Sequence, residues 1–443
     1  MQVINNTSAT EFLNYLRMLE LNGYTKTFEN AIDGNRYASV KDAQGNVFYL
    51  YYMETTKENT ADPFFDNRVH IICDLSSNVS LEEFCYSVPA SKDTEFYVFN
   101  LNTTGEDTIL IHTADNAWIM IDGGVTDWGT KVNDPDGKFA DSIYQFMREK
   151  SGLKDGEKLV ISAWYLTHAH RDHFLAFGSM LARNHAGIEL QRILANVPDT
   201  SVISDDNHSY YVTVMDTVNT YYPNVKFLKA HAGMEIQLAD VHFTVLSASD
   251  SLVQYWTSNQ DEWNTHWSKW VYGKTCTQCD GSECLLGRKC YDFNNSSTVT
   301  KITIGNMTIL STGDAYRIDR WMVPYYSMDT LSVDILKVAH HFNNHELVGK
   351  DSAASQIDKS KFYWKLLEAR ANDTLYAIVT NIGFSASNSK TSWKNAFNNS
   401  QDHHFIEANY NTIYGFKSVN GEVVMTEYQA IYSYTGKVDN TAK

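Results

Sequence analysis

The stretch "THAHRDH", from Thr167 to His173, places three histidines and an aspartate within seven residues. His168 and His170 are two positions apart, so on an extended segment both side chains point to the same side and can bind one metal ion together. Asp172 and His173 come after the chain turns and can face a second ion beside the first. Zinc binds imidazole nitrogen and carboxylate oxygen, and catalytic zinc sites keep one position open for water. The alternative, a solvated polar turn, holds only if this cluster stands alone.

The flanking residues place the cluster at the end of a buried strand. "KLVISAWYL", residues 158–166, is short and almost continuously apolar, which is typical of such a strand. "FLAFGSMLARNH", residues 174–185, has the pattern of a helix. The cluster therefore lies on a strand-to-helix loop at the carboxyl end of the strand, where ligand sites of layered α/β folds collect.

Three further stretches supply the same kinds of ligand at other strand ends. "MIDGG" puts Asp122 between an apolar strand and a double-glycine turn, and "ILSTGDA" puts Asp314 after another strand. "ILKVAHH" ends a third strand with His340 and His341. Each alone could be an ordinary turn, cap or polar edge. Together with "THAHRDH" they form the set of ligands that a binuclear metal site needs.

The chain divides into two units with different patterns. Residues 1–92 predict a small α+β unit, in which a helix over 8–23 is followed by strands over 36–40, 47–53 and 69–75. Ser8 with Glu11 three residues later predicts the helix N-cap. No catalytic cluster occurs in this unit. Residues 93–443 alternate strands with helices and contain all four motifs, which predicts a larger α/β domain that carries the metal site.

Composition and charge exclude some partners. The formal net charge of the 443 residues is -17, without a basic stripe, so we expect no nucleic-acid partner. No apolar stretch approaches the roughly 20 residues of a membrane span, so none is expected. The N-terminus shows neither the basic nor the apolar region of a signal peptide, which leaves the location open between the cytoplasm and export with the signal removed. The oligomeric state also stays open.

An insert over about 250–295 carries most of the cysteines and a group of tryptophans. The sequence "CTQCDGSECLLGRKC" could form a structural zinc site, two local disulfides or a loop of free thiols. The four cysteines are Cys276, Cys279, Cys284 and Cys290. The tryptophans could form a cage for a quaternary ammonium such as choline, or simply the core of the insert. They are Trp256, Trp263, Trp267 and Trp270.

The order of these motifs resembles that of the metallo-β-lactamase fold superfamily, over roughly residues 95–435. The chain looks most similar to the branch that contains the competence-type DNA-uptake hydrolase domain and the pneumococcal-type phosphorylcholine esterase. Three segments carry this finer resemblance: "NNSSTVTKITIGNMTILSTGDA" at 294–315, "DILKVAHH" at 334–341 and "NTIYGFKSVNGEVVM" at 411–425. The resemblance implies an α/β fold, the four-layer αβ/βα sandwich, with metal ions at one edge.

The resemblance also implies roles for individual residues. His168 and His170 would bind the first metal ion, and Asp314 would bridge the two ions. The ligands of the second ion would be Asp172, His173 and His340. Asp122 would not bind an ion itself but would orient the loop that carries the ligands. The residues expected to act in catalysis are Asp172, Asp314 and His341.

The chain departs from the superfamily pattern at three places. Many members have a further histidine ligand, for which His231 and His208 are the candidates here. Phe342 stands where a glycine usually follows the histidine pair. The later "HP" motif is absent, and His403 and His404 are no obvious substitute.

These observations predict a binuclear metal-dependent hydrolase. Two divalent ions, zinc with manganese or iron as alternatives, would share a water and hold it as hydroxide. The expected substrate is a small phosphodiester, possibly including a phosphorylcholine ester. One alternative is a hydrolase of carbonyl substrates such as a lactone, thioester or β-lactam, because fold alone does not fix chemistry. The other is a non-catalytic binding protein.

Overall fold

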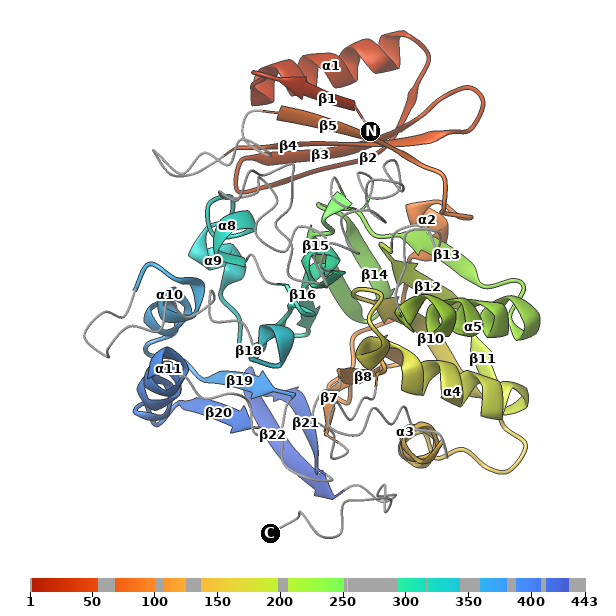
Figure 1. Cartoon of the computed structure of the whole chain (residues 1–443), viewed down its shortest axis with the longest axis vertical. Coiled ribbons are helices and arrows are strands. Elements are labelled where there is room, and N and C mark those ends of the chain that lie inside the picture. The colour runs from red at the N-terminus through yellow and green to blue at the C-terminus, as the bar shows by residue number, and fades with distance from the viewer. Residues whose placement is uncertain are drawn as a thin grey trace.

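The computed structural model has a mixed α/β architecture, as the sequence predicts. It describes residues 2–54, 68–100, 107–124, 137–197, 206–250, 253, 293–315, 318–342, 359–380, 388–407 and 412–429. The strands form three sheets, and the helices cover their outer faces (Figure 1). Among the described residues no helix combines the length and the apolar character that crossing a membrane requires.

The N-terminal unit is an antiparallel sheet covered by one helix. Its strands follow the order β1 (Gln2–Asn5), β5 (Arg68–Asp74), β4 (Val47–Met53), β3 (Asn35–Lys41) and β2 (Thr25–Ile32). Helix α1 (Ala9–Leu21) starts with the predicted capping box, in which the side chains of Ser8 and Glu11 each accept from the other's backbone N–H. It lies on the sheet face that points away from the rest of the chain (Figure 1).

The opposite face of this sheet is part of the core of the second unit. Side chains alternate along a strand, so Tyr52 packs under α1 while Tyr51 turns to the other side. Tyr37 on β3 belongs to the same second core, and its hydroxyl hydrogen-bonds the hydroxyl of Tyr326. The strand β6 (Tyr86–Ser87), before the predicted boundary at residue 92, pairs with β14 of the second unit. The two units are therefore joined by buried packing and by strand pairing.

The second unit contains two larger sheets. The nine-stranded sheet has the order β13-β12-β10-β9-β8-β7-β21-β22, with β11 beside β10. Its strands are β7 (Glu95–Asn100), β8 (Thr108–His112), β9 (Trp118–Asp122), β10 (Leu159–Leu166), β11 (Ile188–Leu190), β12 (Arg192–Ala195), β13 (Lys226–Lys229), β21 (Thr412–Val419) and β22 (Glu422–Gln429). Strands β9, β10, β12 and β13 are parallel, so their carboxyl ends share one edge.

The eight-stranded sheet has the order β20-β19-β18-β17-β16-β15-β14-β6. Its other strands are β14 (Glu235–Ala239), β15 (Val241–Ser247), β16 (Val299–Ile304), β17 (Met307–Ser311), β18 (Ile335–Lys337), β19 (Leu375–Val379) and β20 (His403–Glu407). Strands β17 to β20 are parallel. Each sheet thus has an edge at which consecutive parallel strands end together, and the sequence motifs follow those ends.

Helices cover the outer faces and give four layers: helix, sheet, sheet, helix. The first helical layer contains α3 (Lys138–Lys150), α4 (Leu175–Asn184) and α5 (Asp206–Tyr221). On the other side lie α8 (Ile318–Trp321), α9 (Met328–Leu331), α10 (Phe362–Ala369) and α11 (Asn388–Asn398) (Figure 1).

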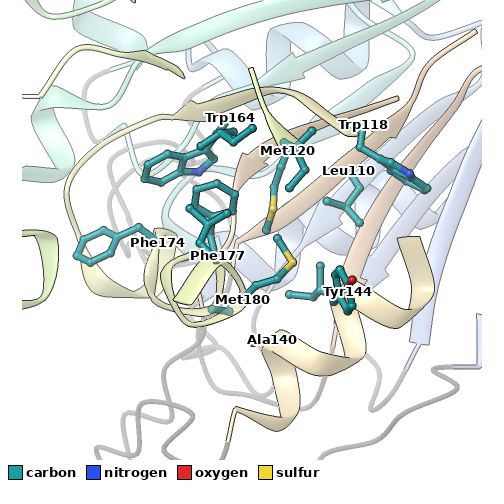
Figure 2. Close-up of a cluster of buried hydrophobic side chains, with 14 of the residues drawn as sticks. Leu110, Trp118, Met120, Ala140, Tyr144, Trp164, Phe174, Phe177 and Met180 are labelled. Carbon is teal, nitrogen blue, oxygen red and sulfur yellow. The ribbon is translucent and has the colours of Figure 1, made fainter. Parts of the chain in front are cut away.

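Separate apolar clusters join these layers. One of these clusters fills the space between the two sheets and includes Ile121 and Ile309. In the first helix–sheet layer, Trp164 of β10 stacks on Phe177 of α4 with ring centroids 4.2 Å apart (Figure 2). Strand β10 is buried almost throughout, which explains its continuously apolar sequence.

Candidate metal centre

The "DGG" turn after β9 is pressed against the histidine loop after β10. Asp122 has φ 59° and Gly123 has φ 128°, both in the left-handed region, so the chain turns sharply here. The amides of Gly123 and Gly124 both donate to the carbonyl of Asp107, at 2.8 and 3.2 Å. A Cβ on Gly124 would lie 1.6 Å from the carbonyl oxygen of Asp172. Only glycine therefore fits at this crossing of the two loops.

Asp122 fixes the start of the histidine loop. Its Oδ1 accepts from the Thr167 amide and its Oδ2 from the Thr167 hydroxyl, both at 2.8 Å. Nδ1 of His173 lies 2.8 Å from the same Oδ2. The Thr167 hydroxyl is in turn 3.2 Å from Nδ1 of His168. Asp122 thus orients the His173 imidazole directly and the His168 imidazole through Thr167, in both cases at Nδ1, which leaves Nε2 of both turned the other way.

Two groups of potential ligands meet at Asp314. His168, His170 and Asp314 form one group, with ligand atoms all within 4.8 Å of one another. The other group is Asp107, His173, Asp314 and His341, within the same distance. Oδ2 of Asp314 lies 3.9 Å from Nε2 of His168 and 3.3 Å from Nε2 of His173. Since Asp314 belongs to both groups, the arrangement can hold two ions that share this carboxylate.

The buried donor atoms fit metal ions. Nε2 of His168, His173 and His341 and Oδ1 of Asp172 are buried and have no hydrogen-bond partner among the described residues. An unsatisfied buried polar atom costs roughly 1–3 kcal/mol, so a cluster of them at one place fits a site that binds metal ions. Imidazole nitrogen with carboxylate oxygen is the donor set that zinc and iron accept.

The structure places His341, and not His340, in the group around Asp314. The sequence predicts His340 as the ligand, with His341 as the alternative ligand and as the residue expected to act in catalysis. Nε2 of His341 lies 3.6 Å from Oδ2 of Asp314 and 3.4 Å from Oδ2 of Asp172. Nε2 of His340 lies 3.2 Å from the side-chain nitrogen Nδ2 of Asn294. Burial lowers the pKa of His340 to about 4.

A strained turn is the physical reason for this exchange. His340 and His341 both have φ 49°, and Phe342 has φ 62°. Left-handed backbone costs roughly 1–2 kcal/mol for each non-glycine residue, so the surroundings must impose it. Phe342 is buried against the rings of Trp393 and Tyr363. Because the chain leaves the extended conformation after β18, strand alternation no longer decides which histidine faces the site.

The other predicted ligands lie together on the histidine loop. Asp172 and His173 are part of the short 3₁₀ turn η1 (Arg171–His173) that follows His170. Asp172 is not a member of either ligand group, but its Oδ2 faces His341 and its Oδ1 is one of the buried atoms without a partner. The rings of His168 and His170 lie 4.7 Å apart, as expected for neighbours on the same side.

Sequence reasoning missed Asp107, Lys337 and Thr380. Lys337 forms an ion pair with Oδ2 of Asp107, and the Thr380 hydroxyl donates to Oδ1 of the same carboxylate. All three are buried. A lysine within the apolar strand "ILKV" was the available signal, because a buried ammonium needs a partner. Asp107 gave no comparable signal, since an aspartate just before a strand reads as a turn residue.

The electrostatics of the site are dominated by its carboxylates. Burial alone would lower the pKa of His173, but Asp314 and Asp122 raise it well above its ordinary value. Burial likewise opposes charge on His341, whose pKa Asp314 and Asp107 raise. Burial and its neighbouring histidines lower the pKa of His168 well below its ordinary value. Protons on His173 and His341 thus balance charge that bound cations would otherwise balance, so metal binding should release protons.

The remaining candidates whose side chains the structure describes do not belong to the two groups. His231 lies between two carboxylates, with Nδ1 2.5 Å from Oδ1 of Asp250 and Nε2 3.6 Å from Oδ2 of Asp74. His208 is in α5, but its side chain lies outside the described residues. His403 and His404 are on β20, where His403 bonds the carbonyl of Arg370. The cysteine and tryptophan residues of the insert, 256–290, lie outside the described residues.

His231 should instead stabilise the contact between the two units, in a pH-dependent way. Burial opposes its charge, but Asp250 and Asp74 raise its pKa above the ordinary 6.5. Its contribution is therefore complete below pH 6.5 and is lost as the pH rises through the folded-state pKa. The pKa of Asp74 is lowered despite burial, chiefly by His231, so its contribution is present above pH 3.8. We expect His231→Gln to cost about 3–5 kcal/mol in urea unfolding at pH 5.5 and clearly less at pH 8.5. An equal cost at both pH values would contradict the charged bridge.

Comparisons with known proteins leave the family open. No family model matches the chain, and no curated protein matches it. Among solved structures, CmlA, a diiron β-hydroxylase from Streptomyces venezuelae, is 11% identical, with a TM-score of 0.33 over 77% of this chain. A mutant of the CmlA β-hydroxylase is 10% identical, with a TM-score of 0.34 over 84% of this chain. The chain spans 55% and 69% of the length of these two structures. Similarity this weak supports no inference about function, which must come from the site itself.

Proposed function

We propose that this chain is a binuclear metal-dependent hydrolase of the metallo-β-lactamase fold superfamily, and that its substrate is a small phosphodiester. The observation that carries the proposal is the position of Asp314 in both ligand groups, at the edge where parallel strands of the two sheets end. The order of the motifs along the chain and the four-layer arrangement support the superfamily. The competence-type and phosphorylcholine esterase branch remains a proposal that rests on the three sequence segments.

Each residue has a role in this proposal. His168, His170 and Asp314 would hold one ion, and the ligands of the other would be Asp172, His173, His341 and Asp314. Two divalent ions would lower the pKa of bound water towards about 7 and polarise an oxygen of the substrate. Asp172 and His341 face each other beside the place where the two ligand groups meet, so they can orient the attacking water and the substrate. Asp122 lies at Nδ1 of His173 and Asp107 near Nδ1 of His341, and both contacts would keep Nε2 of these imidazoles turned towards the ions.

The charges of the site favour an anionic substrate. Four buried carboxylates, Asp107, Asp122, Asp172 and Asp314, and one buried ammonium surround the position of the ions. With neutral imidazoles and a neutral bound water, two divalent ions would leave this set with a net charge of about +1, and the attacking hydroxide would bring it to about zero. The negatively charged oxygen of a phosphodiester would be attracted to the two cations more strongly than the neutral carbonyl oxygen of a lactone or thioester. The overall charge of -17 disfavours a polynucleotide, so we expect a small molecule.

The test is hydrolysis of two chromogenic phosphodiesters, bis(p-nitrophenyl) phosphate and p-nitrophenyl phosphorylcholine, by protein loaded with zinc or manganese. We expect turnover that disappears in Asp314→Ala. Turnover of bis(p-nitrophenyl) phosphate alone would exclude a phosphorylcholine ester as the substrate. Two bound ions per chain without phosphodiester turnover would overturn the phosphoesterase proposal, and hydrolysis of a chromogenic β-lactam would then favour carbonyl substrates. Failure of the wild-type protein to bind any metal ion would favour the binding-protein alternative.

A further inference from the structure

Lys337 is a charged residue within a buried strand. Its side chain is 1% exposed, at the end of β18. Its Nζ pairs with Oδ2 of Asp107, donates to the carbonyl of Gly313 at 3.0 Å, and lies 3.6 Å from Oδ1 of Asp314. Burying an ammonium group is costly unless oxygen atoms surround it, and all three contacts are oxygen. The fold therefore holds this charge directly beside the carboxylate that the two ligand groups share.

The two oxygens of Asp314 have different neighbours. Oδ2 faces Nε2 of His168, His173 and His341, at 3.9, 3.3 and 3.6 Å. Oδ1 faces the ammonium of Lys337. The amide of Asp314 is held separately, by donation to the hydroxyl of Ser297 at 3.0 Å. The ammonium thus lies at the oxygen of Asp314 that does not face the imidazoles, where it can keep Oδ2 turned towards them.

The same ammonium acts on His341 through Asp107. Oδ2 of Asp107 forms the ion pair with Lys337, and Oδ1 accepts from the Thr380 hydroxyl. Oγ1 of Thr380 lies 3.1 Å from Nδ1 of His341. Outer partners of this kind set the orientation of a ligating imidazole. Lys337 is therefore connected to the shared carboxylate directly and to one imidazole through two side chains.

We infer that Lys337 is a positioning residue of the metal centre. It keeps Oδ2 of Asp314 and Nε2 of His341 turned towards the place where the two ligand groups meet. This inference rests on the proposed metal centre. A different role is possible for a buried ammonium: it could merely compensate for excess carboxylates. The two roles predict opposite effects on metal affinity when the charge of Lys337 is removed. A positive charge beside a ligand repels a divalent cation, so a simple compensator weakens metal binding, whereas a positioning residue strengthens it.

The deciding experiment replaces Lys337 by methionine, which keeps the length of the side chain and removes its charge. Binding of Zn²⁺ is measured by competition with a chromogenic chelator, and the number of ions per chain by elemental analysis. We expect the affinity for the more weakly bound ion to fall by about 10–100-fold in Lys337→Met. We also expect the visible spectrum of the Co²⁺-loaded protein to change, because that spectrum reports the ligand geometry. Unchanged or tighter binding with an unchanged spectrum would overturn the inference.

A double variant separates positioning from folding. Lys337→Met leaves the Asp107 carboxylate buried without its cation, which should destabilise the metal-free protein. Lys337→Met with Asp107→Asn removes both charges and should restore the urea midpoint of the metal-free protein towards that of the wild type. Because Asp107 itself belongs to one ligand group, the reference for affinity is Asp107→Asn alone, and we expect the double variant to bind metal more weakly than this single variant. Affinity equal to that of Asp107→Asn would show that the unpaired carboxylate caused the loss and would overturn the inference. If the wild-type protein itself binds no ion, the proposed function fails instead.

Discussion

Asp314→Ala should abolish the binding of two metal ions and reduce phosphodiester turnover by more than about 10³. The reason is geometric: Asp314 is the residue shared by the two ligand groups among the described residues. A single electrostatic contact with the transition state already contributes about 10²–10³ in rate, so loss of the ions should cost more. Elemental analysis of the dialysed protein and steady-state kinetics measure the two effects together.

The matched control is Asp155→Ala, which makes the same change on an exposed loop. It should retain two ions per chain and wild-type turnover. His168→Ala, which belongs to one ligand group only, should retain one ion and thus fall between the two. If Asp314→Ala keeps both ions, the shared carboxylate is not a bridge and the ligand assignment is wrong.

Gly124→Ala should disrupt the metal centre although it adds only one methyl group. The new Cβ would overlap the backbone of Asp172 and His173, with contacts of 1.6 Å to the Asp172 carbonyl oxygen and 2.2 Å to the His173 nitrogen. Backbone atoms cannot move aside as a flexible side chain can, so one of the two loops must shift. We expect the loss of at least one bound ion and a cost of about 3 kcal/mol or more in the free energy of unfolding.

Gly152→Ala is the control for this substitution. Gly152 has φ 63°, so alanine there is strained, but no atom lies within 4 Å of the added Cβ. We expect a cost of about 1 kcal/mol from backbone strain alone, with metal content and activity unchanged. Wild-type metal content in Gly124→Ala would show that the crossing of the loops is looser than the structure describes. Urea unfolding and elemental analysis on both variants make the comparison.

Much of the fold followed from local patterns in the sequence. The continuously apolar run before "THAHRDH" predicted the buried strand β10, and the 3.6-residue periodicity after it predicted α4. The capping box of α1 was visible as Ser8 and Glu11. These predictions succeeded because each depends on residues close together in the chain. The packing of the N-terminal sheet into the second unit was not visible, since it depends on which strand face finds a partner.

The assignment of the histidine pair shows the limit of such patterns. Two adjacent histidines after a strand have equal claims, and the choice depends on a left-handed turn that is stabilised by the burial of Phe342. The turn is unfavourable locally and is offset by contacts of Phe342 with residues distant in the sequence, among them Trp393 and Tyr363. No local rule could have selected His341.

What the sequence determined by itself is the set of ligand types and their places at strand ends, because spacing of two residues and strand termination are local properties. How these strand ends meet depends on the packing of the two sheets. Asp314 joins two groups because parallel strands of separate sheets end at a common edge. Lys337 and Asp107 are far apart in the sequence, and the packing of the sheets buries them side by side, where each charge needs an oppositely charged partner. Contacts of this kind depend on the packing of the whole chain.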